Sequence, residues 1–144
     1  MDDHFSERDS VMVAVKVAIV EDDPILCFLL EEICRAAQCE VVGSASNVTD
    51  ARTLLLRKGA DALILDFALD GEEDGLELLE TVRRDFPAME TILVTGWDHA
   101  NLQERIDFVA PDHMLKKPVT PKDLTNILQG TALRLRRRAF AKAA

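Results

Sequence analysis

The chain has 144 residues, 48% of them hydrophobic, and a formal net charge of −9. This length suits one compact domain with one core, and the apolar content excludes a disordered chain. The negative charge argues against a dedicated binder of nucleic acid or anionic membranes, because both carry negative charge themselves.

The start of the chain, Met1–Asp9, is acidic and polar, so it is not a secretory signal. The longest apolar runs are too short to span a bilayer. The three cysteines, Cys27, Cys34 and Cys39, lack the spacing of a disulfide framework or zinc site, and we interpret them as small buried hydrophobic residues. We therefore expect a reduced cytoplasmic protein with no membrane contact, with residues 1–13 as a flexible leader.

The first half of the chain predicts three strands and two helices. Short β-branched apolar runs indicate buried strands, and apolar residues three or four apart indicate helices. Pro24 suits a first helical turn, and Asn47 or Thr49 can cap the second helix. The predicted strands are Val15–Val20, Val41–Val42 (closed by Gly43) and Ala62–Leu65, and the predicted helices run from Pro24 through Ile33 and from the second cap to Gly59.

The second half continues the alternation with two strands and three helices. A loop with four acidic residues, Asp70, Glu72, Glu73 and Asp74, separates the third strand from the third helix. Pro87 ends that helix, and Pro121 begins the last one. The predicted helices are Leu76–Val82, Asn101–Phe108 and Pro121–Leu135, and the predicted strands are Thr91–Val94 and Met114–Leu115.

Strands that alternate with helices predict a parallel sheet, because parallel strands need crossover connections. We therefore predict an α/β fold: a doubly wound, flavodoxin-like, five-stranded parallel sheet flanked by five helices. Such folds bind ligands at the carboxyl ends of their strands. The residues expected there are Glu21, Asp22, Asp23, Asp66, Thr95, Gly96, Lys117 and Pro118.

Clustered carboxylates repel one another, and two charges about 4 Å apart cost roughly 4 kcal/mol at an effective dielectric of about 20. A cation relieves this repulsion, and hard oxygen ligands suit Mg²⁺. Asp66 is a plausible nucleophile, since carboxylates form acyl phosphates. Lys117 and Thr95 could then stabilise the oxygens of a phosphoryl group.

With these fragments in order, the sequence resembles the receiver domain of two-component response regulators. The resemblance covers roughly Val15–Ala132, and we assign residues 14–133 to a receiver domain and 134–144 to a basic helix end or tail. The fragments that carry it are Ile19-Val20-Glu21-Asp22-Asp23-Pro24, Ala62-Leu63-Ile64-Leu65-Asp66, Asp74-Gly75-Leu76-Glu77-Leu78-Leu79, Leu93-Val94-Thr95-Gly96 and Leu115-Lys116-Lys117-Pro118.

The resemblance implies a role for each matching residue. Asp66 would be the phosphoacceptor, and Asp22, Asp66 and the backbone carbonyl of Ala68 would bind Mg²⁺ directly. Glu21 would act on the metal largely through water. Thr95 would be the switch hydroxyl and Lys117 the phosphate-binding lysine, with Lys116 the less favoured candidate. Gly96 and Pro118 would be structural, with a cis bond before Pro118.

Two departures from the family pattern concern output. Asp70 stands where the family has a proline after the phosphoacceptor, and Gly75 lies nine residues after Asp66 where eight is usual. Met114, preceded by His113, stands where the family has Tyr or Phe. These departures put the partner choice and the readout of phosphorylation in question.

Several other interpretations stay open at this stage. The loop from Asp66 to Glu77 partly echoes a calcium-binding loop, although Ala68 removes one ligand. A Mg²⁺-dependent phosphohydrolase would need a second acid at position 68. The pocket could also remain in a phosphorylation-independent interaction module. The basic tail is either a solvated helix end or a docking surface for an acidic partner.

We predict a stand-alone receiver that accepts a phosphoryl group from a histidine kinase or phosphotransfer protein and catalyses only its own phosphorylation and dephosphorylation. It would signal by changed affinity for an unknown downstream protein, as a monomer or a homodimer. By resemblance, that partner would contact the face formed by the fourth and fifth helices and the fifth strand.

Overall fold

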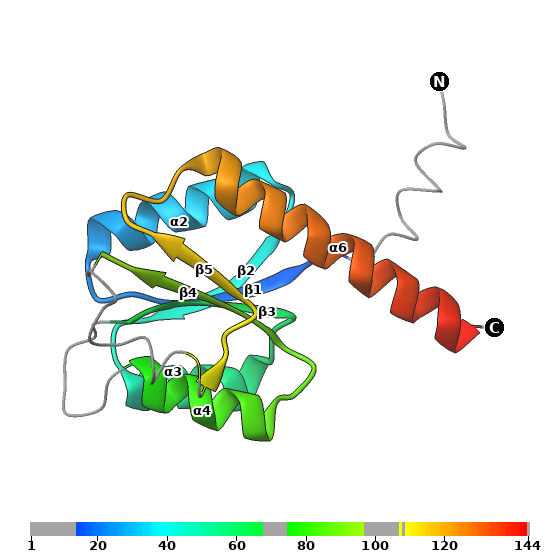
Figure 1. The fold of residues 1–144 in the computed structure, drawn as a ribbon, viewed down its shortest axis with the longest axis horizontal. Helices are drawn as coiled ribbons and strands as arrows, with labels where there is room; N and C mark the ends of the chain where they lie inside the picture. Colours follow the sequence, from blue (N-terminus) through cyan, green and yellow to red (C-terminus); the bar gives the residue numbers. More distant parts are fainter. Residues whose placement is uncertain (1–13, 68–74, 97–106, 108, 144) are drawn as a thin grey trace.

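The computed structural model describes residues 14–67, 75–96, 107 and 109–143. Within these residues, five strands form one sheet and four helices cover it (Figure 1). The strands are β1 (Lys16–Val20), β2 (Glu40–Ala45), β3 (Ala62–Asp66), β4 (Glu90–Thr95) and β5 (His113–Lys116). The helices are α2 (Pro24–Ala36), α3 (Val48–Lys58), α4 (Gly75–Asp85) and α6 (Pro121–Ala143).

The strand order is β2-β1-β3-β4-β5, and every neighbouring pair is parallel. This confirms the predicted doubly wound parallel sheet. The order reverses beside β1, so the carboxyl ends of β1 and β3 border the crevice where such folds bind ligands. The helix predicted over 101–108 lies outside the described residues, apart from Asp107.

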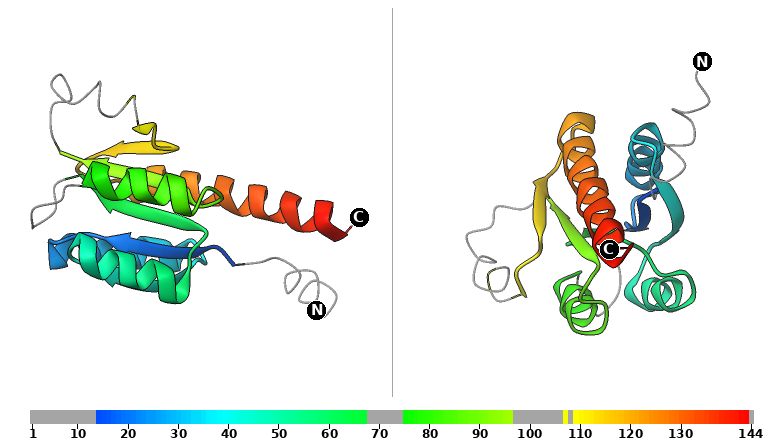
Figure 2. Two further views of the ribbon diagram at one scale, coloured as in Figure 1. Left: turned by 90° about the horizontal axis from the view of Figure 1, so that it is seen from below. Right: turned by 90° about the vertical axis from the view of Figure 1, so that its right-hand side faces the viewer.

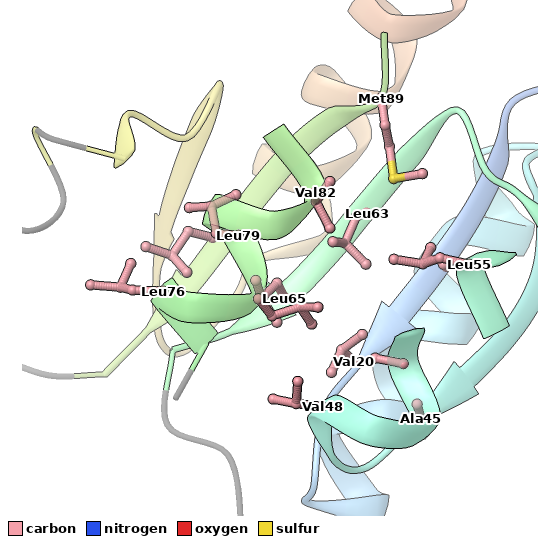
Figure 3. Packing of buried hydrophobic residues seen from close by; sticks show 14 residues of the cluster. Val20, Ala45, Val48, Leu55, Leu63, Leu65, Leu76, Leu79, Val82 and Met89 are labelled. Carbon is pink, nitrogen blue, oxygen red and sulfur yellow. The ribbon is translucent and has the colours of Figure 1, made fainter. Parts of the chain in front are cut away.

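Two helices cover each face of the sheet, as Figures 1 and 2 show. α2 and α6 lie on one face, and α3 and α4 lie on the other. The middle strand β3 is buried along its whole length, because its alternate side chains enter the two core layers. The layer beneath α3 and α4 is drawn in Figure 3, where Leu63 and Leu65 from β3 meet Leu55, Leu79 and Val82.

The second strand differs from its prediction. β2 runs from Glu40 to Ala45, so Gly43 lies inside the strand and does not close it. The register shifts there, because Val17 pairs with Val41 but Ala18 pairs with Gly43. A Cβ atom at Gly43 would lie 2.7 Å from Leu54 Cδ1, so this glycine marks an irregular point where α3 approaches closely.

The predicted helix starts are confirmed in detail. Pro24 occupies the first turn of α2, and the Asp23 carboxylate accepts a hydrogen bond from the N–H of Ile25 at 2.9 Å. Asn47 caps α3 by accepting from the N–H of Asp50, also at 2.9 Å. Gly59 follows α3 with a φ of 69°, a left-handed conformation that favours glycine.

The last helix is longer than its apolar pattern predicts. α6 has 23 residues and continues to Ala143, so the basic segment from Arg134 is helical throughout the described part. Its later turns project beyond the sheet (Figure 2). None of the helices in the described part of the chain is both long and apolar enough to cross a bilayer.

The three cysteines behave as the sequence predicts. All are free thiols; Cys34 is buried, and Cys27 and Cys39 are partly buried. Burial raises the pKa of the Cys34 thiol to about 12, so it stays protonated and unreactive at neutral pH.

Candidate functional site

Four strands deliver polar side chains to the same edge of the sheet. Glu21 follows β1, Asp66 ends β3, Thr95 ends β4 and Lys117 follows β5. Glu21, Asp66 and Thr95 are all buried, with exposed fractions of 3%, 3% and 1%. The chain leaves the sheet at the ends of these strands. Polar and charged side chains that a hydrophobic core would not accommodate can therefore collect at this edge.

Three carboxylates meet at this edge. One oxygen each from Glu21, Asp22 and Asp66 lies within 4.8 Å of the others. Two of these residues are buried and Asp22 is partly buried, so water screens their repulsion incompletely. The predicted acidic cluster is therefore present as a spatial group.

Lys117 is the cation that faces this cluster. Its Nζ atom donates a hydrogen bond to Asp66 Oδ2 at 3.2 Å and lies 3.8 Å from Glu21 Oε1. The Lys117 side chain is 30% exposed, whereas that of Asp66 is 3% exposed, so the lysine reaches the buried acid from the more open side of the site. Within the described residues, one lysine thus faces three carboxyl groups, an arrangement that favours binding of a further cation.

The pKa of Glu21 is raised from 4.5 to about 8. Burial is the largest cause, and the neighbouring Asp66 adds to it through a hydrogen bond and through its charge. The backbone N–H of Asp23, which donates to Glu21 Oε2 at 3.1 Å, and the charge of Lys117 act in the opposite direction. Ionisation of the Glu21 side chain is therefore disfavoured, and a further cation in the site would stabilise its ionised form.

The donor set fits a hard divalent cation. Glu21 Oε1 is buried and accepts no hydrogen bond within the described residues, so it retains an oxygen available for a ligand. Carboxylate oxygens at this spacing match the ligands of Mg²⁺, which binds few carboxylates and keeps water or phosphate oxygens. Glu21, Asp22 and Asp66 would hold the ion. The predicted third ligand, the carbonyl of Ala68, lies outside the described residues.

Thr95 and Lys117 are joined through the backbone. The N–H of Lys117 donates to the carbonyl of Thr95 at 2.9 Å, which fixes the start of the segment after β5 against the end of β4. The Lys117–Pro118 peptide bond is cis, as the resemblance implies. The predicted hydroxyl and ammonium are therefore held at the same edge of the sheet as Asp66.

Two glycines near the site differ in how tightly they are constrained. A Cβ atom on Gly75, the first residue of α4, would lie 2.4 Å from the backbone oxygen of Asp66. At Gly96 a Cβ would make only ordinary contact with Lys117, at 3.5 Å. Space therefore requires glycine at position 75 but not at 96, where the proposed structural role remains a prediction.

Sequence reasoning did not assign roles to Asp23 and Gly75. Asp23 caps α2 and its N–H orients Glu21, while Gly75 lets α4 begin against the backbone of Asp66. The capping signal was readable from Asp23 before Pro24. The close approach of Gly75 to the backbone of Asp66 could not be predicted from the sequence, because it depends on where α4 begins relative to the end of β3.

Met114, at the position where an aromatic is usual, lies on β5 and is 41% exposed. Its neighbour His113 points to a different cluster, with Nε2 3.3 Å from Glu90 Oε1 at the amino end of the sheet.

The fold and the site together define a signalling receiver. The response regulator receiver domain family matches residues 17–129, so this chain belongs to that family. Among solved structures, the receiver domain of AraT from Geobacillus stearothermophilus is similar, with a TM-score of 0.77 and 26% identity over 88% of this chain and 99% of that one. A CheY-like receiver from Methanospirillum hungatei shares the fold, with a TM-score of 0.78 at 22% identity over 88% of this chain and 99% of that chain.

Two curated relatives are similar to this chain over part of their own length. The two-component response regulator ORR22 of Oryza sativa subsp. indica is 28% identical over 85% of this chain and 18% of its own length. The transcriptional regulatory protein CitT of Bacillus subtilis is 28% identical over 79% of this chain and 50% of its own length. The chain thus spans at most half of each of these two relatives and matches a part of each.

Proposed function

We propose that the chain accepts a phosphoryl group on Asp66 in a Mg²⁺-dependent reaction, and that the donor is a phosphohistidine of a kinase or phosphotransfer protein. The observation that carries this proposal is the contact of Lys117 Nζ with Asp66 Oδ2 at 3.2 Å, inside a cluster of three carboxylates. A lone buried acid would repel phosphate, whereas an acid paired with a lysine and a cation accepts it.

The chain's own residues have distinct parts in the transfer. An Asp66 carboxylate oxygen attacks phosphorus, an O–P bond forms, and the P–N bond to the donor histidine breaks. The electron pair of that bond returns to the imidazole, which takes a proton from solvent. Lys117 would pair with a phosphoryl oxygen, and the Thr95 hydroxyl would donate to another. A bound Mg²⁺ would offset the charge of the carboxylates and the phosphoryl oxygens.

The protein partner would dock beside this edge of the sheet. Three large apolar side chains on α2, next to Asp23, are exposed: Ile25 (80%), Phe28 (62%) and Leu29 (44%). An apolar group of this kind favours a protein surface over solvent. We therefore expect Phe28→Ala to slow transfer from a phosphorylated donor protein but not from acetyl phosphate.

Phosphorylation would change the affinity of the chain for a downstream protein by shifting a two-state equilibrium. The only reaction it catalyses would be its own phosphorylation and dephosphorylation, and the site of action would be the cytoplasm. The exposed Met114, in place of an aromatic, favours a readout that does not depend on an inward-packing ring.

The test is incubation of the protein with Mg²⁺ and acetyl phosphate, followed by intact mass spectrometry. We expect the mass of one phosphoryl group, which is absent in Asp66→Ala and present in the exposed-carboxylate control Asp85→Ala. Absence of any adduct, from acetyl phosphate or from a donor protein, would instead favour an interaction module independent of phosphorylation. Multiple turnover on phosphate esters would indicate a phosphohydrolase.

A further inference from the structure

The final helix has an inner part and a projecting part. Leu124, Leu128 and Thr131 are buried against the sheet. From Arg137 to Lys142 every residue is exposed, and this segment contributes nothing to the core clusters. At 1.5 Å per residue these six residues span roughly 9 Å of helix. Figure 2 shows that the end of α6 projects beyond the sheet.

A buried ionic cluster anchors the base of this projection. Glu90, the first residue of β4, is 8% exposed and accepts two hydrogen bonds from Arg134, at 2.5 and 2.7 Å. The Thr131 hydroxyl donates to the same carboxylate at 2.8 Å. A guanidinium held in a bidentate pair fixes the direction of the helix at this point. The projecting turns are therefore held in a defined orientation relative to β4.

The charge of the chain is strongly segregated. Residues 124–144 contain no acidic side chain and five basic ones, so their charge is +5. Because the whole chain carries −9, residues 1–123 carry −14. The basic residues are Arg134, Arg136, Arg137, Arg138 and Lys142.

The last turns of α6, from Leu133 onward, also expose two large apolar side chains on one face. Leu133 and Phe140 are 49% and 62% exposed, and they are seven residues apart, which places them on the same side of a helix. Arg137 lies between them, four residues after Leu133. Arg136 lies on the other side of this row, about 60° around the helix from Leu133. Arg138 and Lys142 lie on the opposite side of α6, where Arg138 donates to the carbonyl of Ala88 at 3.5 Å.

We propose that this face, the α6 docking surface (Leu133, Arg136, Arg137 and Phe140), binds an acidic amphipathic helix of a partner protein. Apolar side chains at heptad spacing suit a partner helix with apolar residues at the same spacing. Carboxylates beside that apolar row would pair with the two arginines. The inference does not depend on phosphorylation of Asp66.

The negative charge of residues 1–123 favours a single partner helix over a membrane or a nucleic acid as the ligand of this surface. A membrane surface or a nucleic acid extends over many ångströms and would bring its negative charge near the −14 of residues 1–123. A single helix contacts only the projection, whose length is about one Debye length, ~8 Å. Pairing with the same face of a second copy would set Arg136 and Arg137 against their own counterparts.

The test uses the full chain and a fluorescein-labelled synthetic peptide of three heptads, with Leu at positions a and d and Glu at e and g. Fluorescence anisotropy should show saturable binding that weakens as salt is raised. We expect the double variant Arg136→Glu/Arg137→Glu, and separately Phe140→Ala, to bind at least tenfold more weakly. Circular dichroism checks that each variant remains folded.

A matched control is Arg57→Glu/Lys58→Glu, which makes the same change in charge on two exposed residues of α3. Its binding should stay within twofold of the parent chain. The proposal is overturned if the peptide does not bind, if a scrambled peptide of the same composition binds equally well, or if the control loses as much affinity. Tighter binding to phosphatidylglycerol vesicles or to duplex DNA than to the peptide would also overturn it.

Discussion

Lys117 Nζ donates a hydrogen bond to Asp66 Oδ2 at 3.2 Å, although the two residues are 51 positions apart in the chain. The parallel order of β3, β4 and β5 makes this contact possible, because it places the carboxyl ends of these strands at one edge. The same lysine lies 3.8 Å from Glu21. One side chain thus bridges both buried acids of the site.

Replacing Lys117 should impair phosphorylation without unfolding the domain. In Lys117→Met, phosphoryl transfer from acetyl phosphate should be roughly 100-fold slower, because a charge that stabilises the transferring oxygens is lost. Initial rates of adduct formation by mass spectrometry measure this effect. The neighbouring Lys116→Met, an exposed position on β5, is the control and should stay near the parent rate. Equal losses in both variants would contradict the assignment.

Adding one methyl group at Gly75 should be costly. A Cβ there would lie 2.4 Å from the backbone oxygen of Asp66, which cannot move without disturbing β3. We expect Gly75→Ala to lower the free energy of unfolding by about 3 kcal/mol. In Gly96→Ala the new Cβ meets Lys117 at 3.5 Å, so the change should stay within about 0.5 kcal/mol. Urea unfolding of both variants provides the comparison, and equal stabilities would refute the steric argument.

Mg²⁺ should stabilise the folded domain through the acidic cluster. At ten times its dissociation constant, a ligand that binds only the folded state adds about 1.4 kcal/mol. Asp22→Asn removes one of the three clustered carboxylates, so thermal melts of this variant should respond less to Mg²⁺. It should also be more stable than the parent without metal, because the repulsion falls. Asp85→Asn, an exposed acid on α4, should respond like the parent; an unchanged response in Asp22→Asn would argue against the site.

The ionic cluster at Glu90 should make stability depend on acid pH. Burial alone would raise the pKa of Glu90, but hydrogen bonds from Arg134, Thr131 and His113 outweigh it and lower the pKa from 4.5 to about 2. A lowered folded-state pKa contributes stability above the unfolded value, and that contribution is lost as pH falls from about 5.5 toward 2. Because Arg134 is 43% exposed at the side chain, we expect this contribution to be only about 1–2 kcal/mol.

Glu90→Gln is the matched variant for this dependence, since it keeps the shape and removes the titration. Urea unfolding at several pH values should show a smaller loss between pH 5.5 and 3 in the variant than in the parent chain. Parallel losses in the two proteins would show that other acids dominate the acid response.

The sequence predicted the fold and the acidic site because both follow from local patterns. Alternating strands and helices allow few topologies, and the ends of parallel strands must share an edge. Glu21, Asp66, Thr95 and Lys117 could therefore be grouped without coordinates. The strand around Gly43 was predicted too short, because glycine usually signals a turn and the close approach of Leu54 depends on packing.

The anchor at Glu90 could not be predicted from the sequence. Glu90 is 23 residues from His113, 41 from Thr131 and 44 from Arg134, and a surface carboxylate would fit the same sequence pattern. The sequence left residues 134–144 as a helix end or a tail, because a basic, alanine-containing segment has helical propensity but no apolar stripe to mark it. Both features depend on where the first residue of β4 meets the last helix.

The most direct test of the proposed function is chemical trapping of the phosphorylated residue. The protein is incubated with Mg²⁺ and acetyl phosphate and then treated with sodium borohydride, which reduces an aspartyl phosphate to homoserine. Tandem mass spectrometry of the peptides locates the product. The structure predicts homoserine at position 66 and at no other aspartate. Trapping at another aspartate, or no trapping despite a folded Mg²⁺-bound protein, would contradict the assignment of Asp66 as the phosphoacceptor.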